Sequence, residues 1–286
     1  MTKKLLIGFL IFFFSSPSFS YLPSAETIIR NNANERLFLK GLKLSHKILF
    51  PEFQCEETLY FTSSNILRTD FQCHNTFYTL LRTQNSLKQI YNQKVNLLTA
   101  RPLSFLPALL LLKDEELLFS LLSHFQFISA EKTEPKKDED KKAEWTLTGM
   151  VSLVRTGKIE KGTQNKLERN VDFLLTSPTE SSNQIWFDKN LFLPQKIQHE
   201  ETEILFQNYR EIPVREKRSF RYPQKVEIQK GNSLQITIET LFDKIDANPS
   251  FEKKDFDPIW IAKNQSSSEG AENIKETLEK FISEYR

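Results

Sequence analysis

Few side chains in this sequence are spaced for catalysis or metal binding. The glutamates Glu56 and Glu57 would face opposite sides of a strand, and a solvated turn explains the cluster His199-Glu200-Glu201. With 7 glycines in 286 residues, the chain contains no phosphate-binding loop, nucleophile elbow or dinucleotide fingerprint. We therefore expect a non-enzymatic protein without a cofactor or metal. The histidines are scattered, with no His-Glu-x-x-His motif or other paired metal spacing: His46, His74, His124 and His199.

The two cysteines, Cys55 and Cys73, each follow a Phe-Gln pair. The segment between them fits a strand, a turn at residues 63–65 and a returning strand, so a bond between the cysteines would tie the base of a hairpin. A redox role is not indicated, because the sequence lacks the Cys-x-x-Cys spacing. In an exported chain we expect a structural disulfide, which contributes about 3 kcal/mol in the chain-entropy model.

The N-terminus has the features of a secretory signal peptide over residues 1–20. A short basic start precedes the apolar run from Leu5 to Phe14, which is too short to span a bilayer. Ser18 and Ser20 place the cleavage site before Tyr21, and no cysteine follows it for lipidation. No later run reaches the length of a transmembrane helix. We therefore expect a mature protein in the periplasm, with no transmembrane span.

The charges of the chain are balanced. It contains 39 Lys and Arg against 37 Asp and Glu, and loss of Lys3 and Lys4 with the signal peptide leaves 37 of each. Such a balance gives no broad attraction to nucleic acid or to anionic membranes. The basic stretch from Arg210 to Arg221 is interpreted as the solvated edge of a hairpin. We therefore expect no nucleic-acid partner.

The last third of the chain alternates apolar and polar residues with a period of two. In the run from Leu234 to Glu239, Leu234, Ile236 and Ile238 share one face, and the polar side chains share the other. This pattern predicts an antiparallel sheet with one buried and one solvated face. Further strands are predicted at 45–50, 58–62, 66–73, 76–82, 87–92 and 145–155, and the sheet continues to Phe242.

Two helices are predicted near the ends of the mature chain. Ser24 can cap a helix over Ala25–Lys40, with Gly41 as its stop, and Ala271–Arg286 forms an amphipathic helix after a flexible joint. Between them, residues 130–142 are charged and have no apolar residue to fold around, which predicts a mobile insert. We expect one domain over residues 21–258, followed by the joint and C-terminal helix over residues 259–286.

The segment from Leu103 to Ile128 is apolar nearly all round. Lys113-Asp114-Glu115-Glu116 interrupts it, and Asp114 is placed to cap a second helix. A helix without a polar face must be buried on most sides or lie against other apolar groups. Two interpretations are open. The segment is either a fixed core helix packed on the sheet, or a plug over an apolar cavity that opens for a lipid tail.

Several short pieces of the sequence resemble a known family. They are Glu57-Thr-Leu-Tyr-Phe followed by Ile66-Leu-Arg, the strand pair around 185–194, Tyr222-Pro-Gln-Lys-Val-Glu-Ile through Ile238, and Asn248-Pro-Ser-Phe. With the export signal and the early helix, they look like the outer-membrane lipoprotein-sorting carriers. The resemblance implies an α+β fold, in which a curved antiparallel sheet (a half-barrel) wraps round an apolar helical plug and holds acyl chains inside. It also implies an arginine that holds the lid shut, for which Arg68 is the candidate.

The expected function is the non-catalytic binding of acyl chains of a lipid or lipoprotein, for carriage or sorting in the cell envelope. An alternative is a ligand-free module of the same fold for envelope interaction or sensing, and the C-terminal helix could contact an envelope protein partner. The expected lipid-binding residues come from the plug and the sheet: Phe61, Leu109, Leu112, Leu118, Phe119, Leu122, Phe206, Ile236 and Ile238.

Overall fold

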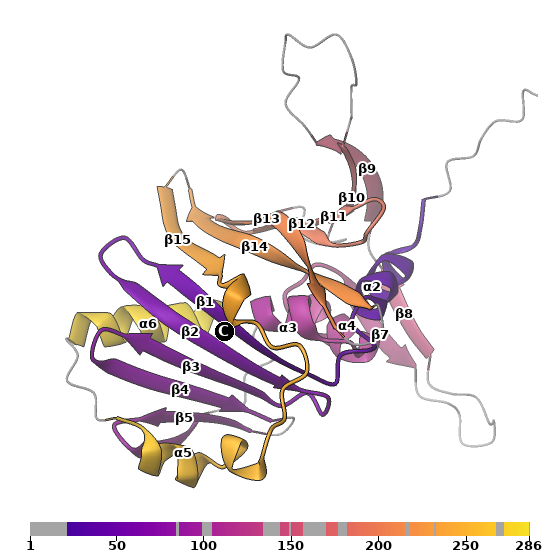
Figure 1. Ribbon diagram of the computed structural model, residues 1–286. Helices are drawn as coiled ribbons and strands as arrows, with labels where there is room; N and C mark the ends of the chain where they lie inside the picture. The colour runs from indigo at the N-terminus through magenta and orange to yellow at the C-terminus, as the bar shows by residue number, and fades with distance from the viewer. Residues whose placement is uncertain are drawn as a thin grey trace, which may run out of the picture.

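One curved sheet dominates the structure, a computed structural model that describes residues 22–83, 86–98, 105–133, 144–148, 150–156, 170–176, 182–214, 218–231, 233–266 and 272–285. Within these residues, thirteen antiparallel strands follow the order β6-β5-β4-β3-β2-β1-β15-β14-β13-β12-β11-β10-β9, and β7 pairs with β8 separately. Figure 1 shows the two halves of the large sheet, which meet where β1 pairs with β15. The predicted α+β class and curved antiparallel sheet are confirmed, whereas the predicted signal peptide lies outside the described residues.

The strand bounds agree with the alternating pattern to within a few residues in most places. The strands are β1 (Gly41–Leu49), β2 (Gln54–Thr62), β3 (Leu67–Cys73), β4 (Thr76–Arg82), β5 (Leu87–Tyr91), β6 (Lys94–Leu98), β7 (Ser129–Thr133), β8 (Glu144–Thr148), β9 (Met150–Thr156), β10 (Asn170–Thr176), β11 (Gln184–Asp188), β12 (Pro194–His199), β13 (Thr202–Pro213), β14 (Ser219–Lys230) and β15 (Ser233–Thr240).

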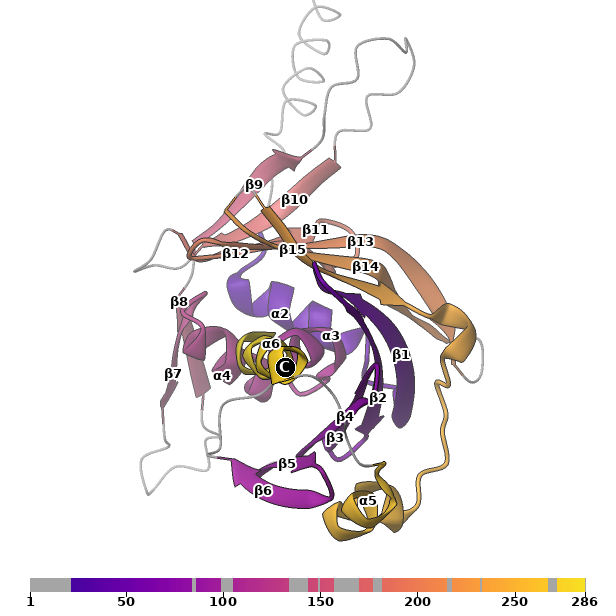
Figure 2. The same cartoon turned by 90° about the vertical axis from the view of Figure 1, so that its left-hand side faces the viewer.

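Helices cover the concave face of the sheet. Figure 2 shows α2, α3, α4 and α6 gathered inside the curve, whereas α5 lies outside it. The Ser24 side chain caps α2 and the Asp114 side chain caps α4, as the sequence predicts. No helix in the described part of the chain has the length and apolar character needed to cross a bilayer. The helices are α2 (Ala25–Asn34), α3 (Phe105–Leu111), α4 (Glu115–His124), α5 (Pro258–Asn264) and α6 (Glu272–Tyr285), with 3-10 turns η1 (Phe242–Lys244) and η2 (Lys253–Phe256).

The first helix is shorter than predicted. It ends at Asn34 rather than at Lys40, and Gly41 begins β1 instead of stopping the helix. The backbone N–H of Arg36 donates to the carbonyl of Ala33, while the Arg36 guanidinium folds back onto the carbonyl of Asn32. That carbonyl would otherwise accept the next helical hydrogen bond. The side chain of a buried residue therefore ends the helix, which periodicity does not reveal.

Part of the predicted mobile insert is strand. Residues 130–133 belong to β7, and each pairs with a residue of β8, for example Ala130 with Leu147 and Lys132 with Trp145. A charged run can pair in this way because backbone groups, which every residue carries, form the ladder. Residues 134–142 of the insert lie outside the described residues.

The predicted disulfide between Cys55 and Cys73 is confirmed. The two cysteines follow directly on the register pair Glu56–Gln72, so the bond joins the open end of the β2–β3 hairpin. Both are at most 2% exposed and lie in the core with the helices on the concave face. The bond therefore closes a loop of 18 residues within the best-packed half of the sheet.

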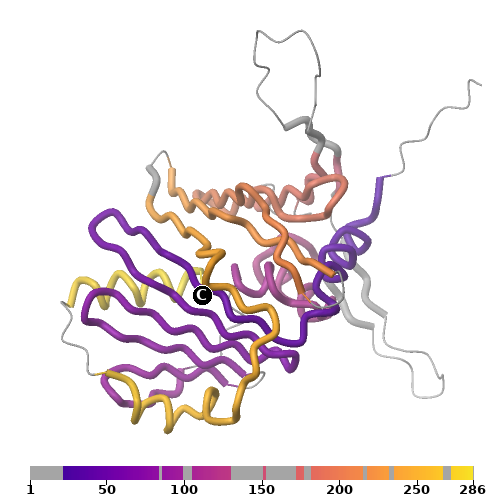
Figure 3. The backbone as a smooth tube through the Cα atoms, viewed as in Figure 1, coloured from indigo at the N-terminus to yellow at the C-terminus, as the bar shows by residue number. Residues whose placement is uncertain are grey.

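The C-terminal segment crosses from one face of the sheet to the other. After β15 the chain runs over the outer face to η2 and α5, whereas α6 lies against α3 on the concave side (Figure 3). Phe281 of α6 packs edge-on against Phe50 and Phe71 of the sheet half, with ring centroids 5.4 and 6.4 Å away. The apolar face of the C-terminal helix, which could have contacted a separate protein, is thus covered by the same chain.

Removal of the disulfide should destabilise the fold without changing it. The double variant Cys55→Ala, Cys73→Ala should lose about 3 kcal/mol of unfolding free energy, because an open chain of that length gains conformational entropy when it unfolds. Urea unfolding followed by circular dichroism measures the loss. Wild-type protein that reacts with a thiol reagent while denatured and unreduced would contradict the bond.

The docking of α6 should weaken at alkaline pH. Burial, with a smaller effect of Glu284, raises the pKa of the Tyr285 hydroxyl from 10.0 to about 12. The hydroxyl therefore contributes stability that is complete below pH 10 and is lost as the pH rises toward 12. Between pH 8 and 11, Tyr285→Phe should gain about 1 kcal/mol relative to wild type, measured by urea unfolding at both pH values. An equal loss in both proteins would exclude this contribution.

Candidate functional site

The nine residues expected to bind lipid all lie in one buried cluster. The cluster joins the concave face of the sheet to α3 and α4, and none of the nine is more than 8% exposed. Leu109 lies in α3, Leu112 directly follows it, and Leu118, Phe119 and Leu122 lie in α4. The sheet contributes the remaining four from three strands: Phe61 from β2, Phe206 from β13, and Ile236 and Ile238 from β15.

The helix α3 is apolar and buried all round. Its seven residues, Phe105–Leu111, are all buried, which is unusual because a helix on a protein surface keeps one polar stripe. At its start, the Phe105 ring lies 4.6 Å from the ring of Phe125 and 5.7 Å from that of Phe127. At the other end, the backbone N–H of Leu112 donates to the carbonyl of Ala108. This short element fills the centre of the concave face.

A small cavity remains between α3 and the sheet. Its volume is about 10 Å³, the space of a single water molecule. Leu106, Pro107 and Leu110 of α3 form one side, and the strands β1, β2, β14 and β15 form the other. The concave face is therefore filled by helices in this conformation, and any larger ligand needs a helix to move.

The floor of this cavity contains a buried polar pair. His46 Nδ1 lies 2.7 Å from Glu57 Oε2, and their side chains are 2% and 0% exposed. The His46 ring also stacks on Tyr222 with centroids 5.7 Å apart. Removal of one partner of such a pair leaves a polar group without compensation in an apolar interior, which is strongly destabilising. The pair is therefore built into the face that α3 covers.

Sequence reasoning did not bring His46 and Glu57 together. The expectation that Glu56 and Glu57 face opposite sides is confirmed, because Glu56 is exposed and Glu57 is buried. The pairing itself depends on the register of β1 and β2, in which His46 lies directly opposite Glu57. A polar residue at an inward position of each strand was the available signal, but the register was not readable from the pattern.

An arginine that the sequence did not single out holds α3. Arg36, in the turn after α2, donates from Nη1 to the carbonyl of Leu109 at 2.5 Å and from Nη2 to the carbonyl of Asn32 at 2.6 Å. It also donates to the Asn32 side chain. Burial lowers the pKa of the Arg36 guanidinium to about 10, against the opposing effects of Tyr209 and Glu35. Arg36 thus ties the end of α2 to the middle of α3.

Arg68, the expected lid residue, lies on the outer face. Its Nε and Nη2 donate to the two carboxylate oxygens of Asp70 at 2.9 and 2.6 Å, and its Nη1 donates to the carbonyl of Asp255 at 2.7 Å. The guanidinium lies 4.9 Å from the centre of the Tyr60 ring. Successive residues of a strand face opposite sides, and Arg68 follows the inward residue Leu67. These contacts attach the C-terminal segment to the outer face, whereas Arg36 contacts the plug.

Solved structures with a similar course of the chain come from two families. One is a LolA superfamily protein from Nitrosomonas europaea, with 9% identity and a TM-score of 0.46, covering 82% of this chain and 98% of that one. The other is a DUF1329 family protein from Desulfovibrio piger, with 8% identity and a TM-score of 0.43, covering 82% and 96%. The first matches the carrier resemblance of the sequence, at the level of fold. No family model and no curated protein matches the chain.

Replacement of Arg36 should loosen α3. Arg36→Met keeps the aliphatic bulk but removes the donors to the carbonyl of Leu109, so we expect a loss of about 1–3 kcal/mol of unfolding free energy. Hydrogen exchange of the α3 amides should rise more than that of β1 to β4. The matched control is Arg30→Met in the same helix, because Arg30 forms exposed ion pairs with Glu26 and Glu115. Equal exchange in α3 and in the sheet would show that α3 opens only with the whole domain.

Proposed function

We propose that this protein binds acyl chains of a lipid or lipoprotein against the concave face of its sheet, and that α3 is the plug they displace. The observation that carries the proposal is an all-apolar helix of seven residues, buried on every side and attached to α2 through one arginine side chain. With the signal peptide expected from the sequence, this supports carriage or sorting of lipid in the periplasm.

The energies of plug and ligand are of the same order. Burial of a large apolar side chain contributes about 1.5–3 kcal/mol, and α3 contains one Phe and four Leu, so its apolar burial contributes on the order of 10 kcal/mol. An acyl chain with about 14 methylenes gains about 11 kcal/mol on leaving water. The exchange of one for the other is therefore nearly balanced, and a carrier that must release its cargo needs such a balance.

Of the two apolar helices, α3 is better suited to move than α4. The longer α4 has the Asp114 cap at its start, packs against α2, and is tied to that helix by the Arg30–Glu115 ion pair. In contrast, Leu106 and Leu110 of α3 already line the small cavity. Displacement of α3 would extend this cavity along the sheet while α4 remains in place.

Displacement of α3 would also expose the His46–Glu57 pair to the ligand. The pair lies beside the cavity among apolar side chains. A polar group of a lipid, such as an ester or amide near the start of an acyl chain, could hydrogen-bond there, which supports an acylated ligand over a plain hydrocarbon.

The alternative function is a ligand-free module for envelope interaction or sensing. The observation that favours it is the filled interior, since only about 10 Å³ remains beneath α3. A fixed α3 would then be an ordinary core helix. The two functions differ in one measurable respect, namely whether a hydrophobic ligand enters without global unfolding.

Two matched substitutions distinguish the functions. Leu110→Glu in α3 and Leu118→Glu in α4 each replace a buried leucine by a carboxylate. If α3 is a plug, Leu110→Glu should swing outward, keep the sheet folded and alter lipid retention. Leu118→Glu should cost several kcal/mol, because α4 stays in the core and buries the charge. Thermal unfolding, together with native mass spectrometry after incubation with phospholipid vesicles, measures both effects.

The wild-type protein provides the decisive control. It should carry lipid that can be extracted after purification or incubation with vesicles. Wild-type protein that holds no lipid, together with equal unfolding of the two glutamate variants, would assign the chain to the ligand-free alternative.

A further inference from the structure

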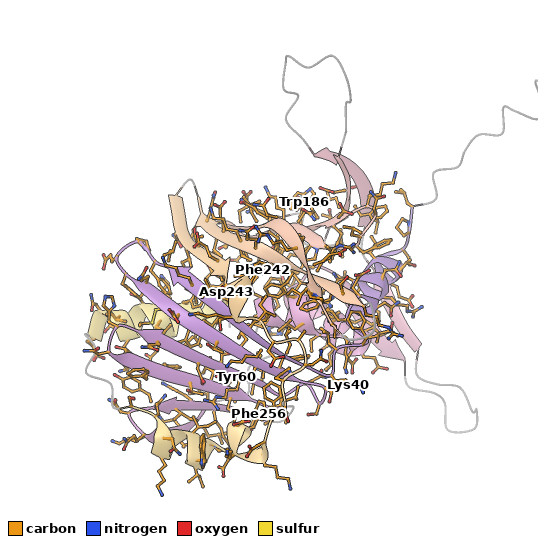
Figure 4. The ribbon with its side chains drawn as sticks, in the orientation of Figure 1. Lys40, Tyr60, Trp186, Phe242, Asp243 and Phe256 are labelled. Atoms are coloured by element: carbon orange, nitrogen blue, oxygen red, sulfur yellow. A yellow bond between two sulfur atoms is a disulfide. The ribbon has the colours of Figure 1, made fainter. Side chains whose placement is uncertain are left out.

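A second pocket lies on the outer face of the sheet, away from the plug. It has a volume of about 430 Å³ and lies between the strands β2, β3 and β4 and the C-terminal helix α5. Figure 4 shows Tyr60 on this face, near the labelled Phe256 of η2. The size falls in the range of small-molecule sites, which extends from roughly 300 to 1,000 Å³. The acyl-chain function described above does not use this pocket.

The floor of the pocket is a grid of side chains set by strand register. Thr58 of β2, Asp70 of β3 and Thr79 of β4 form one row, and Glu56, Gln72 and Phe77 form the next. The Asp70 carboxylate is held in place by Arg68 and by Thr79, whose Oγ1 donates to Asp70 Oδ1 at 2.8 Å. The floor therefore presents fixed hydrogen-bonding groups beside an aromatic ring.

The wall of the pocket is the last turn of α5 and the residues after it. Trp260 is 38% exposed, and the ammonium of Lys254 lies 5.9 Å from its ring. Gln265 Nε2 lies within 3.3 Å of Thr79 Oγ1 and 3.4 Å of the carbonyl of Ile90, which ties the wall to the sheet. Gln265 Oε1 is buried and has no hydrogen-bond partner among the described residues.

The charges of this lining are paired. Arg68 binds Asp70, and Lys244 Nζ lies 3.4 Å from Glu56 Oε2. An anionic ligand would need an uncompensated cation, and a cationic one an uncompensated carboxylate. The charged side chains of the lining already have opposite partners, which favours a neutral ligand. That ligand should have hydrogen-bonding groups for the floor and an apolar face for Trp260.

We propose that this pocket binds a neutral carbohydrate of one or two sugar rings. A pyranose has a C–H face that packs on an indole ring, and hydroxyl groups that both donate and accept hydrogen bonds. Trp260 would take the apolar face, while Gln72, Thr58 and Glu56 would bind the hydroxyls, and a hydroxyl could donate to Gln265 Oε1. The site would give the protein a second ligand independent of its interior.

The test uses the mature full-length protein and three neutral disaccharides, namely maltose, cellobiose and N,N′-diacetylchitobiose. Saturation-transfer NMR and calorimetry should detect at least one of them, and Trp260→Ala should weaken that binding about tenfold or more. The matched control is Trp186→Ala, because Trp186 also lies under a lysine, with Lys196 Nζ 5.1 Å from its ring, but on β11 of the other half of the sheet (Figure 4). That variant should bind like wild type.

A milder variant protects the test from misfolding. Gln72→Ala removes an exposed side chain of the floor, so its fold should be kept while sugar binding falls. Co-sedimentation with purified peptidoglycan then distinguishes a glycan polymer from a free sugar as the source of the ligand. Absence of binding by all three disaccharides and by peptidoglycan, or wild-type affinity in both Trp260→Ala and Gln72→Ala, would overturn the proposal.

Discussion

The burial of one face of a long curved sheet is the constraint on which the rest of this structure depends. A sheet that is apolar on its concave side must be covered, because exposed apolar surface of that extent is unfavourable in water. The chain meets this need with four helices drawn from its beginning, middle and end. The middle helices lack a polar face because the sheet curves around them. Covering the sheet and providing a displaceable plug are thus the same physical task.

The polar groups inside this core explain how an apolar element can have a defined position. Apolar packing has little directionality, so it does not by itself select one placement of a short helix. Arg36 provides direction through its hydrogen bond to the carbonyl of Leu109. The His46–Glu57 pair marks the sheet beneath the same helix. A few buried hydrogen bonds therefore position α3, while apolar burial supplies most of its stabilisation.

The two faces of the β2–β4 region differ in chemistry because a strand alternates its side chains. Inward residues such as Leu59 and Phe71 join the apolar core, while outward residues such as Thr58 and Asp70 line the pocket beneath α5. The C-terminal segment uses both faces, since α5 forms a wall outside and α6 a cover inside. One stretch of sheet thus supports an apolar interior and a polar outer site.

The sequence by itself determined the elements whose signals are local. Period-two alternation indicated the antiparallel sheet, the spacing of Cys55 and Cys73 indicated their bond, and Ser24 and Asp114 marked the starts of helices. The nine apolar residues chosen for the interior lie together because a residue that is apolar at an inward position has few other places to go.

Only the tertiary structure decided the contacts that depend on register and on the path between elements. The pairing of His46 with Glu57 follows from the alignment of β1 and β2, and the contact of Arg36 with Leu109 joins residues 73 positions apart. The same holds for Arg68, whose outward position directs it to the C-terminal segment rather than to the plug. Local patterns determine which face of an element is buried, but the element that covers this face is selected by packing across the whole chain.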